Sequence, residues 1–144
     1  MVAILAMKSK FRDVKISPNW DGTFVLAKSL AYTLVSKPLV SVLFRIGLIW
    51  NGGSVPWIAA WLIPRFGEYD WPFFIHDLGY GCRLRPRKDW DIELLALCKV
   101  VDLELLSKMG WFRRSIMGSV YLTRRHSIYR AVRLAGGSHF TPVV

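Results

Sequence analysis

The chain has 144 residues, a length typical of one domain, and 53% of them are hydrophobic. A core of this size folds without disulfide or metal support, so neither a second domain nor a small stapled scaffold is expected. Lys and Arg number 20 against 10 Asp and Glu, and 7 Trp, 8 Phe and 5 Tyr are more aromatics than such a core needs. Part of this apolar surface is therefore expected to face a partner, a membrane or a pocket.

The first third of the chain predicts extended structure. Asp21-Gly22 is a turn signal, and β-branched and aromatic residues mark candidate strands at 23–27, 30–35 and 39–49. Tight links between these segments predict a small antiparallel β-meander.

Beyond a glycine-rich loop at Asn51–Pro56, the pattern becomes helical. The candidate helices are residues 57–62, 71–80, 86–101 and 111–134, the last ending at Gly136-Gly137. The sequence therefore predicts an α+β fold, with a small N-terminal antiparallel β-meander followed by three or four helices. Residues 1–144 are expected to form a single domain, with 137–144 as a flexible tail.

Three features bear on the compartment. Cys82 and Cys98 lack the CxxC spacing of a zinc site and are expected to be buried, reduced thiols of a cytoplasmic protein. Residues 38–50 are apolar but contain Arg45 and are too short to span a bilayer, so no transmembrane segment is expected. The order of residues 1–8, apolar before basic, does not match a secretory signal.

The motif most relevant to chemistry is His76-Asp77 with Tyr80, followed eleven residues later by Asp91. His76 and Tyr80 are four residues apart on one face of a helix, and antiparallel packing of the next helix would bring Asp91 opposite His76. Asp91 would then accept from one imidazole nitrogen and leave the other free to take a proton from water. His76, Asp91 and Tyr80 are therefore the candidate catalytic residues, with Tyr80 bonding Asp91 or closing the pocket.

The alternative is that His76 and Asp91 only hold two helices together, and the pair taken alone favours this structural interpretation. Other catalytic sites fit less well. Ser54 lacks the GxSxG pattern of a serine hydrolase, and Gly52-Gly53 lacks the lysine and spacing of a phosphate-binding loop.

The C-terminal part is basic, with no acidic side chain after Glu104. Such a segment attracts anionic lipid or an acidic protein, although a solvated helix face would have the same pattern. Basic residues do not interleave with aromatics as in a single-strand-binding module, so specific nucleic-acid recognition is not expected. The candidate partner-binding residues are Arg113, Arg114, Arg124, Arg125, Arg130 and Arg133.

The order of these motifs resembles a phage and prophage family catalogued as a domain of unknown function (number 1353). The matching segments are Trp50–Pro56, His76–Tyr80, Arg87–Asp91 and Tyr129–Gly136. The resemblance covers residues 21–136 and has two departures. Asn51 stands where the family has an aspartate, and Trp90 stands where it has an alanine.

This resemblance implies a bacteriophage-encoded structural or accessory protein, located in the virion or tail or in the host cytoplasm. It would dock onto other phage structural proteins through its aromatic surface and its basic C-terminal helix. A more distant similarity to phospholipases A2 implies the alternative, a metal-assisted hydrolase acting at an anionic membrane. In that case His76 would be the base and Asp91 its orienting partner.

The similarity to phospholipases A2 also implies a calcium site, whose ligands would be Asp77, Asn51, Gly52 and Gly53. Asn51 keeps an oxygen but lacks the charge of the family's aspartate. This departure weakens the hydrolase interpretation, so the sequence favours the docking protein over the enzyme.

Overall fold

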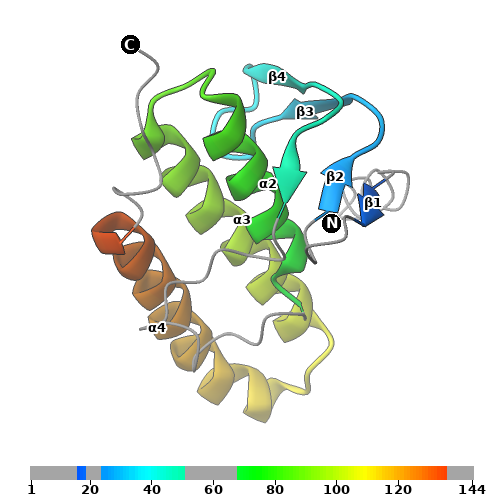
Figure 1. Cartoon of the computed structure of the whole chain (residues 1–144). Helices are drawn as coiled ribbons and strands as arrows, with labels where there is room; N and C mark the ends of the chain where they lie inside the picture. Colours follow the sequence, from blue (N-terminus) through cyan, green and yellow to red (C-terminus); the bar gives the residue numbers. More distant parts are fainter. Residues whose placement is uncertain (1–15, 19–23, 51–67, 136–144) are drawn as a thin grey trace.

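The computed structural model describes residues 16–18, 24–50 and 68–135 (Figure 1). Its strands are β1 (Ile16–Pro18), β2 (Phe24–Leu26), β3 (Leu30–Thr33), β4 (Ser41–Phe44) and β5 (Ile49–Trp50). Its helices are α2 (Asp70–Cys82), α3 (Arg87–Ser107) and α4 (Trp111–Ala135). The expected α+β class is confirmed. The helix expected at residues 57–62 and the tail expected at 137–144 lie outside the described residues.

The strands form two small antiparallel sheets ahead of the three helices, which confirms the small antiparallel N-terminal β-structure expected from the sequence. One sheet has the order β1-β2-β5, and the β3–β4 hairpin forms the other. The run at residues 39–49 is divided into β4 and β5 by a turn at Gly47, where φ is +93°. Glycine adopts this conformation at no steric cost, and the Gly47 amide donates to the Leu26 carbonyl at 2.9 Å. Within this mostly apolar run, Gly47 is the local sign of such a break.

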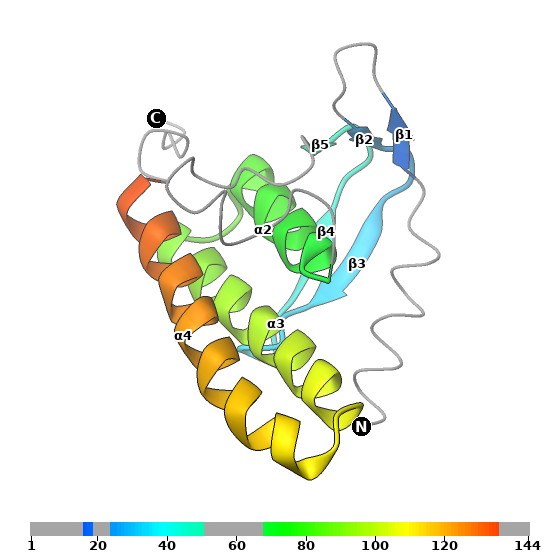
Figure 2. The same ribbon diagram turned by 90° about the horizontal axis from the view of Figure 1, so that it is seen from below.

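The three helices pack side by side as two antiparallel hairpins (Figures 1 and 2). α2 ends where Arg83 takes a left-handed conformation and its amide donates to the Gly79 carbonyl. One face of α3 is buried, and the apolar residues that recur on it at helical spacing are Trp90, Leu94, Leu97 and Val101. None of the described helices is long and apolar enough to cross a membrane.

A buried carboxylate of α3 fastens the β3–β4 hairpin to the helices. Glu93 is fully buried and accepts hydrogen bonds from the Tyr32 hydroxyl and from the Ser36 hydroxyl. It also accepts from the backbone amides of Val35 at 2.7 Å and Ser36 at 2.9 Å. Because these amides belong to the segment that follows β3, α3 determines where the hairpin lies.

Replacing Glu93 with Gln is expected to lower the free energy of unfolding by about 2 kcal/mol, because the new NH2 group cannot accept from these donors. Urea denaturation measures this loss, and amide hydrogen exchange should become faster at Val35 and Ser36. Thr33→Val is the control, since the hydroxyl of Thr33 bonds only in an exposed contact with Ser41. Unchanged exchange at Val35 and Ser36 would contradict the proposed fastening.

Candidate functional site

The α2–α3 hairpin brings His76, Tyr80 and Asp91 together. His76 and Tyr80 lie one turn apart on α2, and their ring centroids are 4.1 Å apart. Asp91, in the first part of α3, is fully buried, and its Oδ1 lies 3.1 Å from His76 Nε2. The Tyr80 hydroxyl donates to the same oxygen. These contacts match the geometry expected from the spacing of the three residues; their chemical roles stay predictions.

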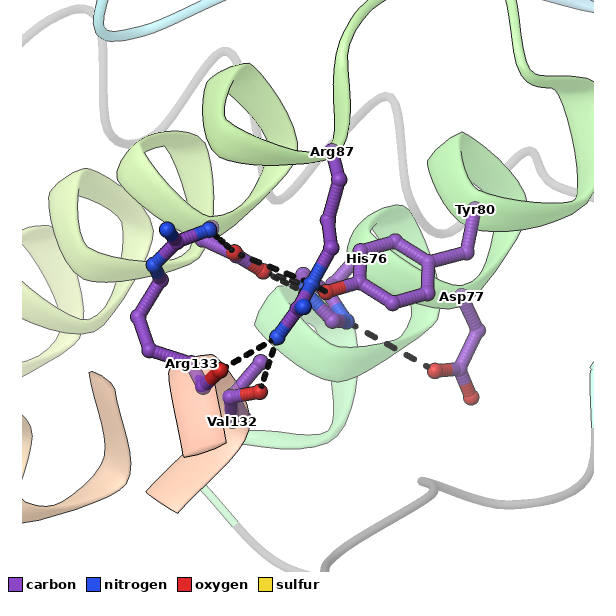
Figure 3. Close-up of polar contacts among 7 residues, drawn as sticks. His76, Asp77, Tyr80, Arg87, Val132 and Arg133 are labelled. Carbon is purple, nitrogen blue, oxygen red and sulfur yellow. Dashed lines mark hydrogen bonds and ion pairs between the residues drawn. The ribbon is translucent and has the colours of Figure 1, made fainter. Parts of the chain in front are cut away.

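Two arginines complete the surroundings of Asp91. Arg133 Nη1 donates to Asp91 Oδ2 at 2.8 Å, and Arg87 Nε lies 3.6 Å from that oxygen. Arg87 also donates to the Tyr80 hydroxyl at 3.1 Å and to the carbonyls of Val132 and Arg133 at 2.8 and 2.6 Å (Figure 3). The last turn of α4 is therefore bound to the start of α3 and, through Asp91, to α2.

Arg133 was expected among the partner-binding residues, whereas no role in the site was predicted for Arg87. Arg87 stands four residues before Asp91, and this i,i+4 spacing of opposite charges is a signal that could have predicted the pair. The contact between Arg133 and Asp91 joins residues 42 positions apart, and local spacing carries no sign of it.

Electrostatics favour the ionised form of the His76–Asp91 pair. Burial lowers the pKa of His76, but the carboxylates of Asp77 and Asp91 outweigh it, so the pKa lies above its ordinary value of about 6.5. Burial raises the pKa of Asp91, but hydrogen bonds from His76, Arg133 and Tyr80 outweigh it, so the pKa lies below about 3.8. The folded protein thus stabilises an imidazolium beside a carboxylate.

This arrangement permits two roles. Asp91 fixes His76 through Nε2, so Nδ1 is left facing Asp77, whose Oδ1 is 3.8 Å away, beyond hydrogen-bonding distance. In its neutral form the ring would accept a proton at Nδ1, and Asp91 would stabilise the imidazolium. The same contacts also join α2, α3 and α4, which is the structural role.

The implied calcium site does not form from the described residues alone. Asn51, Gly52 and Gly53 lie outside them, and both oxygens of Asp91 already face hydrogen-bond donors. Residues 16–18, 24–50 and 68–135 contain no group of three or more His, Cys, Asp or Glu side chains suited to a metal. Asp77 contributes one carboxylate, whereas calcium takes six to eight oxygen ligands.

The remaining arginines expected to bind a partner differ in their surroundings. Arg125 Nη1 pairs with the buried Asp102 at 3.1 Å, and the Arg124 guanidinium lies 4.8 Å from the centroid of the Tyr69 ring. Tyr69 also donates to Asp102. Sequence reasoning missed this second buried cluster, although an aspartate within the apolar face of α3 was a signal for it. Arg124 and Arg125 thus serve contacts within the chain.

The other three, Arg113, Arg114 and Arg130, are more exposed than Arg124 and Arg125. Arg114 donates to carbonyls at the end of α3, including that of Leu106 at 3.0 Å. Arg113 and Arg130 are exposed to solvent. Cys82 and Cys98 both carry free thiols, as expected, but only Cys98 is buried, whereas Cys82 is half-buried.

Comparison of the chain with protein-family models, with curated proteins and with solved structures gives no match. The resemblance of its motifs to the phage family and to phospholipases A2 therefore stays a prediction.

Proposed function

We propose that this protein is a small hydrolase in which His76 activates a water molecule and Asp91 orients the imidazole. The observation that supports this function is the buried contact of 3.1 Å between His76 Nε2 and Asp91 Oδ1. It holds the ring in one orientation and directs Nδ1 away from the pair. Tyr80 is a positioning residue, because its hydroxyl bonds the same carboxylate oxygen.

The substrate class is a carboxylic ester. His76 Nδ1 takes a proton from water while the water oxygen forms a bond to the acyl carbon, and Asp91 stabilises the resulting imidazolium. The ester C–O bond then breaks, and the leaving alcohol takes the proton back from Nδ1. Because only neutral His76 can accept a proton, its raised pKa makes activity increase as the pH rises through that pKa.

The test is hydrolysis of a short-chain p-nitrophenyl ester and of phosphatidylcholine in mixed micelles by the wild-type chain and by His76→Asn. We expect kcat to fall about 100-fold or more in the variant, the usual contribution of a positioned base. His126→Asn is the matched control, since His126 lies exposed on α4 with Nδ1 against the Leu122 carbonyl.

The assay is repeated with added calcium and with a chelator, and circular dichroism verifies that each variant is folded. Wild-type turnover that equals that of folded His76→Asn at every pH would overturn the proposal, as would an equal loss in His126→Asn. A folded His76→Asn that loses turnover, while His126→Asn keeps it, would support the proposal.

A docking protein of a phage particle, which the sequence favours, remains the second candidate. The exposed Trp111 and Phe112 at the beginning of α4 support it, because large aromatics in solvent are typical of a binding surface. Its test is whether the chain co-purifies with phage particles. Recovery of the chain only in the particle-free fraction would overturn this candidate.

A further inference from the structure

The turn between α3 and α4 carries a group of exposed apolar side chains, which we call the hairpin tip (residues 103–116). Exposed fractions are 81% for Trp111, 63% for Phe112, 55% for Ile116 and 50% for Leu103. Phe112 and Ile116 are four residues apart, so they lie on one face of α4. The tip thus places two aromatic and two aliphatic side chains in solvent.

Within the part of the chain that the structure describes, the packing of α4 explains why the side chains of the tip are exposed. The buried side chains of α4 are Tyr121, near the middle of the helix, and Ile128 and Val132 in its later part, so none of residues 111–120 is buried. In both views the turn lies at the end of the molecule away from the β1-β2-β5 sheet (Figures 1 and 2). The tip is therefore a projecting end rather than a groove.

Basic residues surround these apolar side chains. Lys108 and Arg113 are exposed, and Arg114 lies beside them with its guanidinium on the carbonyls that end α3. Glu104 is the acidic residue of the tip and pairs with Lys108 at 3.0 Å. No acidic residue follows Glu104 in the sequence, so the tip and the rest of α4 are positively charged.

We propose that the hairpin tip docks onto an anionic membrane surface, with Trp111 and Phe112 entering the headgroup region and Lys108 and Arg113 facing lipid phosphates. Aromatic residues beside Lys and Arg are the composition that binds such interfaces. A second copy of this chain would bring like charges together. A flat bilayer can also receive a projecting end, because this contact does not require a groove of complementary shape.

The tip already has a fixed conformation before it meets a membrane. Hydrogen bonds from Arg114 to the carbonyls of Leu106, Ser107 and Met109 hold the turn in one conformation. A preformed surface loses little conformational entropy on binding. The inference concerns binding alone and does not rest on the proposed hydrolase; if both hold, the tip would bring the chain to ester-bearing lipids.

The test is co-sedimentation of the full chain with vesicles of phosphatidylcholine alone and with vesicles containing about 30% phosphatidylglycerol. We expect binding to the anionic vesicles that weakens with added salt. Replacing Trp111 and Phe112 together with Ala should lower the partition coefficient at least about tenfold. Arg113→Gln should lower it about fivefold, the effect of one basic charge near an anionic surface.

Two variants serve as matched controls. Leu39→Ala removes a fully exposed apolar side chain from the turn between β3 and β4, and Arg45→Gln removes an exposed charge just after β4. Both should bind anionic vesicles as the wild type does. Circular dichroism verifies that the tip variants are folded.

Three results would overturn the proposal. Equal sedimentation with neutral and anionic vesicles would exclude recognition of anionic lipid. Equal losses in the control and tip variants would exclude the tip as the binding surface. A shift from oligomer to monomer in the Trp111 and Phe112 variant, or capture by an acidic phage protein without vesicle binding, would assign the tip to a protein partner. Loss of binding to anionic vesicles in the tip variants, with unchanged binding in the control variants, would support the proposal.

Discussion

Replacing Asp91 with Ala should lower the free energy of unfolding by about 3–5 kcal/mol, the cost of removing one partner from a buried ion pair. Asp91 is fully buried, and it is the acceptor for His76, Tyr80 and Arg133, with Arg87 alongside. Without it, these donors of three helices lose their common acceptor. Urea denaturation followed by circular dichroism measures the loss.

This loss should depend on pH in a defined way. The lowered pKa of Asp91 contributes stability that is present above its unfolded pKa of about 3.8 and is lost as the pH falls through the folded pKa. The raised pKa of His76 contributes stability that is fully present below its unfolded pKa of about 6.5 and is lost as the pH rises through the folded pKa. The difference in the free energy of unfolding between the wild type and Asp91→Ala should therefore be largest between about pH 4 and pH 6.5.

Asp89→Asn is the matched control, since Asp89 lies two residues earlier on the same helix. Its carboxylate pairs with Lys37 at 2.9 Å and Arg85 at 2.6 Å in a setting closer to solvent, so its loss should cost only about 1 kcal/mol. Equal losses in Asp89→Asn and Asp91→Ala would show that the buried contacts contribute no more than a surface pair.

Replacing Gly79 with Ala should lower the free energy of unfolding by about 2 kcal/mol or more, although Ala favours a helix by about 1 kcal/mol over Gly. A Cβ at Gly79 would lie 2.2 Å from Cδ2 and 2.3 Å from Cε3 of Trp90, which is fully buried. Neither the ring nor the helix can move without disturbing the core. Thermal unfolding by calorimetry would report the loss as a lower Tm.

Replacing Gly118 with Ala should have the opposite effect and raise the free energy of unfolding. Gly118 lies within α4, and a Cβ there would meet nothing within 4 Å, so Ala should raise stability by up to about 1 kcal/mol.

Combining Gly79→Ala with Trp90→Ala should cost less stability than the sum of the two single changes, because the second change removes the clash. A neutral Gly79→Ala, or strict additivity of the pair, would contradict this packing.

The contact between Trp90 and Gly79 is one that the sequence did not indicate. A large indole lies against the bare backbone of Gly79. Neither residue by itself indicates that the two are in contact. Their fit is a property of how α2 packs on α3.

Much of the candidate site could be predicted from local pattern. His76 and Tyr80 share a helix face because they are four residues apart, and the short connection to α3 limits where Asp91 can lie. The spacing was thus sufficient to predict their contact. Arg133 could not be placed in the same way, because a contact between residues distant in sequence depends on the packing of α4.

The sequence by itself determined the α+β class, the buried face of α3 and the association of His76, Tyr80 and Asp91, since each follows from periodicity and short connections. Only the tertiary structure decided the division of residues 39–49 into strands of two sheets, because the sheet that each part of this mostly apolar run joins depends on its neighbours. It also decided which arginines of α4 face α3 and which remain in solvent. The charge pattern of the sequence identifies a basic helix, but only the packing of that helix decides which of its side chains are buried and which are exposed.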